Sequence, residues 1–181
     1  MGVSVVDVAQ TVQLALSGQR YGYFTMNGKQ EALVAGFTAL TKLTSGQVHV
    51  TVSPSADFMP SVDGVSVHKG QGVHPVGLVS TQIANIDPIN KGEFVWTLNV
   101  QDVAIIGRYF LTGKYNAKRT IAITGSEIKD PQYVETIIGA NVADILDGQI
   151  TSDNVRVISG NVLTGDKIEK DGYLGFYHNQ I

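Results

Sequence analysis

The sequence predicts a mixed fold, with an α/β layer in the N-terminal part of the chain and a small α+β domain in the C-terminal part. In the first part, a segment with helical spacing of apolar residues runs directly into a β-branched run typical of a strand. In the second part, short β-branched and aromatic runs surround one short helical segment. Between the two parts lies a stretch rich in turn-forming residues. These patterns therefore predict two bodies.

The first predicted helix covers Lys29–Leu43. Leu33, Phe37 and Leu40 follow one another at spacings of four and three, which places them on one face of an amphipathic helix. Gly46 follows the last periodic residue and is expected to end the helical segment.

Two predicted strands follow this helix. The β-branched run Val48–Val52 ends at a Ser-Pro pair, and a second apolar run covers residues 62–67 around an Asp-Gly turn. Alternating helix and strand is typical of an α/β layer, but a complete doubly wound sheet needs more repeats than this segment supplies. The first domain is therefore expected to be partial.

Residues 70–92 are expected to connect two domains, because they are dense in residues that form turns. These residues are Gly70, Gly72, Pro75, Gly77, Pro88 and Gly92. We therefore predict a partial first domain with its linker at residues 1–92 and a helix plus a second domain at residues 93–181.

The second domain is expected to begin with a helix that packs on the residues after it. Asn99 can cap its start together with Asp102, and Gly113 can end it. Its predicted apolar face comprises Val103, Ile106 and Phe110.

The rest of the second domain has the element order of a β-grasp fold. The predicted elements are strands at residues 120–125 and 133–138, a helix at residues 142–147, and strands at residues 155–158 and 173–177. Asn141 and Asp144 can form a capping box for the helix, and Gly148 can terminate it. In a β-grasp domain, one helix covers one face of a small mixed sheet.

Composition excludes several functional classes. The chain has no cysteine, which removes disulfides, thiolate catalysis and iron–sulfur ligation. The formal net charge is -3 over 181 residues without charge runs, so nucleic acid is not an expected partner. No apolar run approaches the roughly 20 residues of a membrane span, and no secretory signal begins the chain, so the expected compartment is cytoplasmic.

Motifs for catalysis are absent or incomplete. Gly160 to Lys167 has the glycine spacing of a phosphate loop, but Asp166 precedes the lysine and no Ser or Thr follows it, which favours a surface turn. Gly70 and Gly72 lack the third glycine of a dinucleotide fingerprint. Ser159 lies in an apolar run rather than a nucleophile elbow. We expect no catalytic residues in this chain.

For the histidines and the single tryptophan, we weigh a structural role against a role in binding a metal or ligand. No two of the four histidines have the spacing of metal ligands on one helix face, so no metal site is predicted, and His49 is expected to be a hydrogen-bonded strand residue. His178 follows two aromatic residues that can flank a planar ligand, although a structural role is favoured. Trp96 lies at the predicted junction, where core packing is favoured over ligand binding.

Several strings closely resemble the A subunit of the bacterial sodium-translocating NADH:quinone oxidoreductase. They are LTKLTSG at 40–46, HPVGL at 74–78, VWTLNVQDV at 95–103, IGR at 106–108, LTG at 111–113, VRVISGNVLTG at 155–165 and YLGFYHNQ at 173–180. They follow the order of that family over roughly residues 30–181. Because members of the family continue at both ends, the chain is similar to an internal fragment.

This resemblance implies a peripheral subunit on the cytoplasmic side of the bacterial inner membrane. The complex passes electrons from NADH to quinone, such as ubiquinone, and exports sodium. The implied partners are quinone and the other subunits, especially the membrane-embedded B subunit, with flavins and an iron–sulfur centre held by sister subunits. On its own the fragment is expected to have weak or no activity.

More distantly, the helix and the β-grasp pattern are similar to the flavin-binding subunit of respiratory complex I and to the C subunit of Rnf complexes. These relatives join a Rossmann-like domain to a soluble-ligand-binding β-grasp domain, so the same architecture is implied here. The glycine-rich loop for flavin and NADH has no match, and we expect neither cofactor to bind this chain. Family members read Gly-Thr-His-Ile-His where this chain has residues 80–84, STQIA, so no role of those histidines carries over.

The leading hypothesis places quinone-binding residues at the junction and in the terminal aromatic cluster. These residues are Trp96, His74, Tyr177 and His178. The alternative is a free-standing β-grasp module that binds a small ligand without a redox role. A third hypothesis is a hydrolase or nucleotide-binding enzyme, but the sequence lacks the nucleophile motif and the phosphate loop that such enzymes need.

Overall fold

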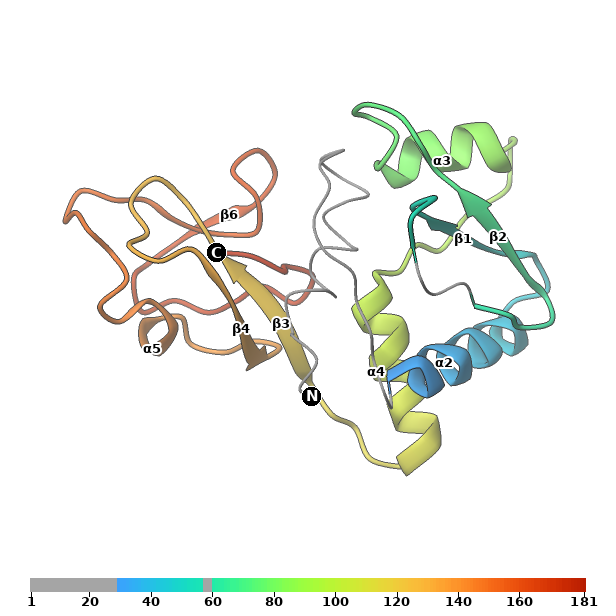
Figure 1. The fold of residues 1–181 in the computed structure, drawn as a ribbon, viewed down its shortest axis with the longest axis horizontal. Coiled ribbons are helices and arrows are strands. Elements are labelled where there is room, and N and C mark those ends of the chain that lie inside the picture. The colour runs from blue at the N-terminus through green and yellow to red at the C-terminus, as the bar shows by residue number, and fades with distance from the viewer. Residues whose placement is uncertain (1–28, 57–59) are drawn as a thin grey trace. The chain divides into compact units, whose positions relative to one another are not determined.

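The computed structural model describes residues 29–56 and 60–181 and forms two units, each with its own hydrophobic core (Figure 1). By their contacts the units divide between Asn116 and Ala117, whereas the sequence suggested a boundary near residue 92. The expected combination of α/β and α+β elements is found in this coarse sense, with helices and parallel strands in the first unit and antiparallel pairs in the second.

The first unit alternates helices and short strands. Its elements are α2 (Lys29–Leu43), β1 (Val48–Val52), β2 (Val65–Lys69), α3 (Val79–Ile86) and α4 (Val100–Thr112). The helix and the strand predicted at residues 29–52 are therefore confirmed. The second strand begins three residues later than predicted, because Gly64 adopts a φ of 81° and completes the turn before it. β1 and β2 pair in parallel, with Val48 opposite Val65.

The core of the first unit forms where α2 crosses α4 (Figure 1). Leu33 and Phe37 of α2 pack against Val103 and Ala104 of α4, and valines of β1 and β2 border this cluster. The predicted apolar face of α2 is thus the face that is buried.

Glycines bring the two helix backbones unusually close together. A Cβ added to Gly107 would lie 1.7 Å from the carbonyl oxygen of Ala32, and one added to Gly36 would lie 2.2 Å from the carbonyl oxygen of Val103. Because real Cβ atoms do not approach oxygen so closely, only glycine permits this crossing.

The predicted packing of α4 on the residues after it is wrong. α4 packs on α2, and its buried face contains Gln101, Val103, Ala104, Ile105 and Gly107. Of the predicted face, Val103 is buried, Ile106 is half-buried and Phe110 is 61% exposed. The backbone contact at Gly107 orients the helix, and this contact outweighs a pattern based on large side chains. Gly113 ends the helix in the left-handed conformation, as predicted.

Helix α3 lies within the segment that was expected to be linker. The glycines and prolines of residues 70–92 flank α3 rather than interrupt it, and none of its residues is buried. A short exposed helix leaves a weak periodic signal, so the turn formers on either side dominated the prediction.

The second unit consists of two antiparallel pairs and one short helix. Its elements are β3 (Lys118–Ile123), β4 (Gln132–Ile137), α5 (Ala143–Leu146), β5 (Val157–Ser159) and β6 (Asp166–Ile168). The β3–β4 hairpin confirms the prediction. The predicted helix at residues 142–147 is shorter in the structure, and Asn141 Oδ1 accepts a hydrogen bond from the Ala143 N–H at 2.8 Å at its start.

The strand predicted at residues 173–177 is wrong. Tyr173 forms only an isolated bridge with Asn141, and a turn follows at Phe176 and Tyr177. β5 pairs instead with β6, which begins directly after the tight turn at residues 161–165. This confirms the turn that the incomplete phosphate-loop pattern suggested. The last residues return to β3, where the Ala122 N–H donates to Asn179 O and the Ile181 N–H donates to Ala122 O, both at 2.9 Å.

The core of the second unit joins all its main elements. Its buried residues are Ile121, Ile123, Val142, Leu146, Val157, Leu174 and Ile181. Within the described ranges, no helix has both the length and the hydropathy required to cross a membrane.

We predict that Gly107→Ala destabilises the first unit despite the better helix propensity of alanine. Propensity alone favours alanine by about 0.8–1.0 kcal/mol. Overpacking against the Ala32 backbone costs about 1–3 kcal/mol or more, so the net change is a loss of stability. Urea unfolding measures the difference. Gly46→Ala is the control, because its nearest atom is the Thr44 hydroxyl at 3.5 Å. Equal midpoints for the two variants would contradict the close helix crossing.

Candidate functional site

The C-terminal turn, which we define as residues 174–181, is fixed to the core of the second unit by a buried arginine. Arg119 lies in β3 and is 1% exposed. Its Nη1 donates hydrogen bonds to the carbonyl oxygens of Phe176 at 2.7 Å and His178 at 3.4 Å. Bonds to a charged donor are stronger than neutral ones, so Arg119 holds the backbone of the turn in one conformation.

Ser159 and His178 form a second attachment of the same turn. The Oγ of Ser159, a residue that is 1% exposed, lies 2.9 Å from His178 Nδ1 and accepts a hydrogen bond from the Gly175 N–H at 2.9 Å. The His178 ring lies against two glycines: an added Cβ at Gly175 would be 2.5 Å from Nδ1, and one at Gly160 would be 2.9 Å from Cδ2. The imidazole therefore fills a space that only glycine leaves open.

This Ser–His pair is built for structure rather than for nucleophilic catalysis. An activated serine needs an exposed hydroxyl and a histidine oriented by a third group. Here the hydroxyl is buried and engaged on both sides, and the ion pairs of the described residues do not include His178. The expectation that Ser159 is an ordinary buried strand residue agrees with this geometry.

The C-terminal turn exposes two aromatic rings to solvent. Phe176 is 56% exposed and Tyr177 is 74% exposed. Their rings meet edge to face, with centroids 4.9 Å apart and an interplanar angle of 75°. Such a pair offers an apolar ring face beside a phenol hydroxyl on a backbone that is already ordered.

The two other predicted site residues belong to the first unit. Trp96 is 85% exposed in a segment without regular secondary structure, so the core packing favoured from the sequence is wrong. Phe94, two residues earlier, is 79% exposed. His74 is exposed in the turn before α3, and its bond to Pro75 is cis. The four predicted residues thus form two groups, Trp96 and His74 in one unit and Tyr177 and His178 in the other.

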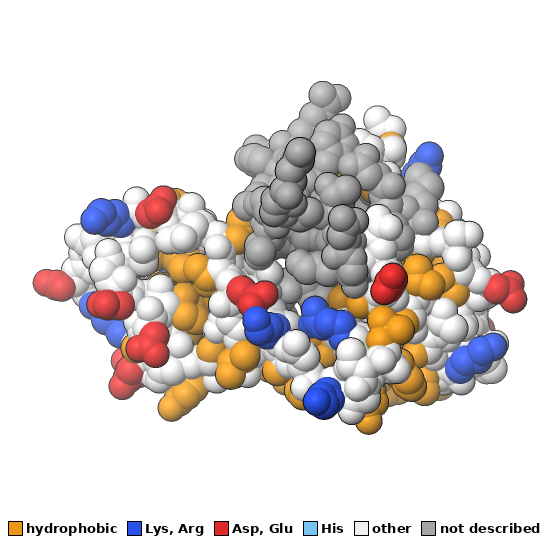
Figure 2. Space-filling view, turned by 60° about the horizontal axis from the view of Figure 1, so that its bottom comes forward, with side chains coloured by type: hydrophobic (Ala, Val, Ile, Leu, Met, Phe, Trp, Pro, Cys, Tyr) orange, Lys and Arg blue, Asp and Glu red, His pale blue; other side chains and the backbone are white. Residues whose placement is uncertain are grey.

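Much apolar surface is exposed in both units. Figure 2 shows hydrophobic side chains at the surface among scattered acidic and basic ones. Exposed large apolar side chains near Trp96 in the sequence include Ile89, Val95 and Leu98, and those at the end of α4 include Tyr109, Phe110 and Leu111. In the second unit, Val162 and Leu163 at the tip of the turn between β5 and β6 are 78% and 90% exposed.

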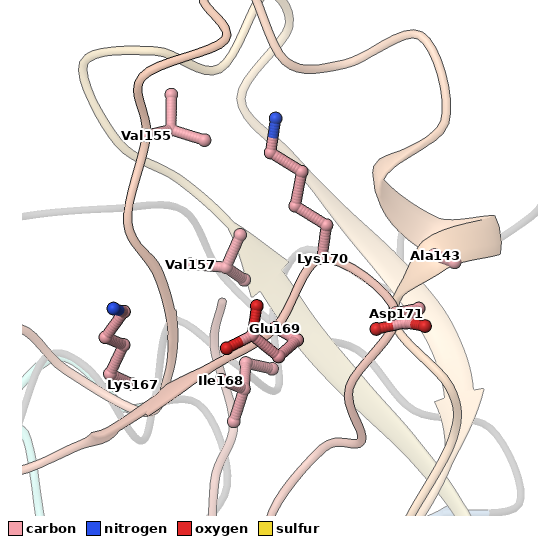
Figure 3. A pocket seen from close by; sticks show the side chains of 8 residues that line it. All are labelled: Ala143, Val155, Val157, Lys167, Ile168, Glu169, Lys170 and Asp171. Carbon is pink, nitrogen blue, oxygen red and sulfur yellow. The ribbon is translucent and has the colours of Figure 1, made fainter.

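A pocket of about 480 Å³ lies in the second unit, and its lining includes none of the predicted site residues (Figure 3). Val155, Val157 and Ile168 supply its apolar wall. Charged side chains of β6 and of the residues after it also line the pocket, and they are Lys167, Glu169, Lys170 and Asp171. No sequence pattern indicated this pocket, because its lining comes from short irregular segments.

Arg119 is the important residue that sequence reasoning missed. Arg119 follows Lys118 and precedes a β-branched run, which is the pattern of a solvent-exposed strand end. The adjacent residues in the sequence therefore give no indication that its side chain is buried. Its partners are backbone carbonyls 57 and 59 residues away, which only the folded chain brings near.

Comparisons with known proteins agree with this two-unit organisation. A family model described as the NqrA second alpha/beta domain matches residues 15–115, and one described as the NQRA C-terminal domain matches residues 120–170. The gap between the two matches coincides with the division between the structural units.

Several curated relatives are named as the A subunit of Na(+)-translocating NADH-quinone reductase. The protein of Marinomonas sp. strain MWYL1 is 41% identical over 152 residues, which are 83% of this chain and 34% of the relative. That of Neisseria meningitidis serogroup B is 42% identical over 149 residues, 81% of this chain and 33% of the relative. The protein of Vibrio alginolyticus is 38% identical over 157 residues, which are 86% of this chain and 35% of the relative. The chain thus spans about a third of the length of these relatives.

The fold defines a mixed α/β protein of two small units. Both units match one family in the same order along the chain. The chain belongs to the NqrA family, and the resemblance derived from the sequence is confirmed.

We predict that Ser159→Ala destabilises the second unit by about 1–3 kcal/mol, because it leaves the Gly175 N–H and His178 Nδ1 without their partner. Thermal or urea unfolding measures the change. Ser126→Ala, at an exposed serine of the same unit, is the matched control and is expected to be neutral. A neutral Ser159→Ala would show that this attachment does not hold the C-terminal turn.

Proposed function

We propose that this chain is a piece of the A subunit of a Na+-translocating NADH:quinone reductase that contributes to quinone binding and docks on the membrane subunits. The observation that carries the proposal is the ordered match of both units to the NqrA family, with about 40% identity to curated subunits over most of the chain. The relatives' complex oxidises NADH and reduces quinone, as its name states.

Exposed aromatic rings support the contact with quinone. A quinone head group is flat and apolar with two carbonyl acceptors, so it suits stacking on an aromatic ring beside a hydrogen-bond donor. Trp96 and the Phe176–Tyr177 pair present such rings, and the Tyr177 hydroxyl and an imidazole N–H of His74 are available donor types. Trp96, His74, Tyr177 and His178 remain our proposed quinone-binding residues, with His178 acting by fixing the backbone of Tyr177.

The exposed apolar residues support docking. Monomeric proteins rarely leave large contiguous apolar surface in water, and such surface marks sites of protein association. We place the subunit on the cytoplasmic side of the inner membrane as a peripheral partner of the membrane-embedded B subunit. Flavins and an iron–sulfur centre belong to sister subunits in this proposal, and no resident cofactor is assigned to this chain.

We further propose that the first unit is part of a Rossmann-like domain and the second is a β-grasp domain. The parallel pairing of β1 with β2 and their packing beside α2 support the first assignment. The order hairpin, short helix, hairpin, and the parallel bridge of Ala122 with Gln180, support the second.

One observation favours a second candidate, a β-grasp module that binds a small ligand without a redox role. The pocket of about 480 Å³ beside β5 and β6 has the size of a small-molecule site. Its mixed rim of lysines and acids fits a polar molecule better than a quinone.

For quinone binding, we expect a short-chain ubiquinone to quench the fluorescence of Trp96 saturably, since this is the single tryptophan. Trp96→Phe removes this signal, so binding of the variants is followed by calorimetry. Tyr177→Ala is expected to weaken binding by a factor of about 2 to 13, because one lost aromatic contact is worth about 0.5–1.5 kcal/mol.

The control for this experiment is Tyr115→Ala, since Tyr115 is comparably exposed at 62% and is not assigned to the site. Equal binding by the Tyr177 and Tyr115 variants would remove Tyr177 from the site. Absence of any saturable signal would leave docking as the role of this piece.

For docking, we expect the double change Phe94→Ser and Trp96→Ser in the full-length subunit to weaken its retention in the purified membrane complex. These side chains are 79% and 85% exposed, so the change removes apolar contact area without touching either core. Subunit stoichiometry after purification measures retention. Leu43→Ser, at an exposed apolar residue at the end of α2, is the control. Unchanged retention would show that this surface does not face the other subunits.

A further inference from the structure

Two histidines of the first unit meet across the β1–β2 pair. His49 lies in β1 and His68 in β2, and the register places Thr51 opposite His68, so the two histidines occupy diagonal positions on one face. His49 Nδ1 lies 3.0 Å from His68 Nε2. The hydrogen-bonded role expected for His49 is observed, but its partner lies 19 residues away on another strand, where sequence spacing gives no indication of it.

The separation of the rings suits a second kind of interaction. Zn–N bonds of about 2.0–2.1 Å in a tetrahedral site place two imidazole centroids about 5.2 Å apart and their ligating nitrogens about 3.3 Å apart. The ring centroids of His49 and His68 are 5.2 Å apart, with an interplanar angle of 38°. The observed ring separation therefore matches that of two imidazoles on one ion, provided that each ring turns until both nitrogen lone pairs point at the ion.

A carboxylate lies close to one of the rings. Asp87, which follows the last residue of α3, places Oδ2 3.5 Å from His49 Nε2. With the proton on Nε2 facing this carboxylate, His49 directs the lone pair of Nδ1 toward His68. Carboxylates commonly fix the tautomer of metal-binding histidines in this way.

The pair is open to solvent and has few protein ligands. The side chain of His49 is 30% exposed and that of Asp87 is 72% exposed, so an ion can reach the rings. Among the described residues, no group of three or more histidine and acidic side chains is arranged around one point, so the protein supplies two imidazole ligands to such a site. Imidazole nitrogen with open positions selects borderline divalent ions such as Zn²⁺, Ni²⁺ and Cu²⁺ over Mg²⁺ and Ca²⁺.

We propose that His49 and His68 form a binding site for one borderline divalent transition-metal ion, with Asp87 as the positioning residue. The ion bridges β1 and β2, and through Asp87 the site is connected to the end of α3. It therefore ties three elements of the first unit together. This inference is independent of quinone binding and of docking.

The test is titration of metal-free, tag-free protein with Zn²⁺ by calorimetry, together with Co²⁺ as a spectroscopic probe. We expect one ion per chain, and at least a tenfold weaker affinity in each of His49→Gln and His68→Gln. Asp87→Asn is expected to weaken binding about 10–100-fold, as is typical when the carboxylate partner of a metal-binding histidine is lost. His74→Gln removes an exposed histidine outside the pair and is the control, with unchanged affinity expected.

NMR of the unchanged protein gives a result that does not depend on the folding of variants. Substoichiometric Co²⁺ should broaden the ring signals of His49 and His68 first, and those of His74 and His178 later. Two results would overturn the proposal: absence of saturable binding, or binding that falls equally in the His74→Gln and His68→Gln variants. A preference for Mg²⁺ over Zn²⁺ would also overturn it, since imidazole ligands do not produce that order.

Discussion

The close contact between the backbones of α2 and α4 at Gly36 and Gly107 is the constraint on which the first unit depends. Because of this contact, α4 belongs to the first unit, although it directly precedes the second unit in the sequence. With its glycine face buried on α2, α4 leaves Tyr109 and Phe110 exposed. The same contact that builds the core therefore also leaves the C-terminal end of α4 with exposed aromatic side chains.

The second unit depends on side-chain hydrogen bonds to hold its C-terminal turn, because its helix and some of its strands are short. Strands of three residues and a helix of four contribute few hydrogen bonds of their own. Arg119 and Ser159 compensate by tying the irregular C-terminal turn to β3 and β5. The bonds of a buried cation to carbonyl oxygens are costly to disrupt, because the loss of these partners leaves a charge without solvation. The turn is thus ordered without being a strand.

Local patterns predicted the local elements and failed for the contacts that join them. The spacing of Leu33 and Phe37 predicted α2, and the β-branched runs predicted β1 and the β3–β4 hairpin. The face of α4 was mistaken because glycine carries no hydrophobic signal, although Gly107 makes the tightest contact. The burial of Arg119 and the meeting of His49 with His68 arise from pairing between distant strands. Of the four predicted site residues, the sequence located the exposed aromatics Trp96 and Tyr177 but misjudged the burial of Trp96.

The two exposed aromatic groups differ in the structure that carries them. Tyr177 extends from a backbone that Arg119 and the Ser159–His178 attachment hold, so binding there orders little more than one side chain. Trp96 lies in a segment without helix or strand and is flanked by other exposed apolar residues. Under the proposed function, Tyr177 therefore offers quinone a single ring on a held turn, whereas the ring of Trp96 belongs to a wider set of apolar side chains that also suits contact with a protein partner.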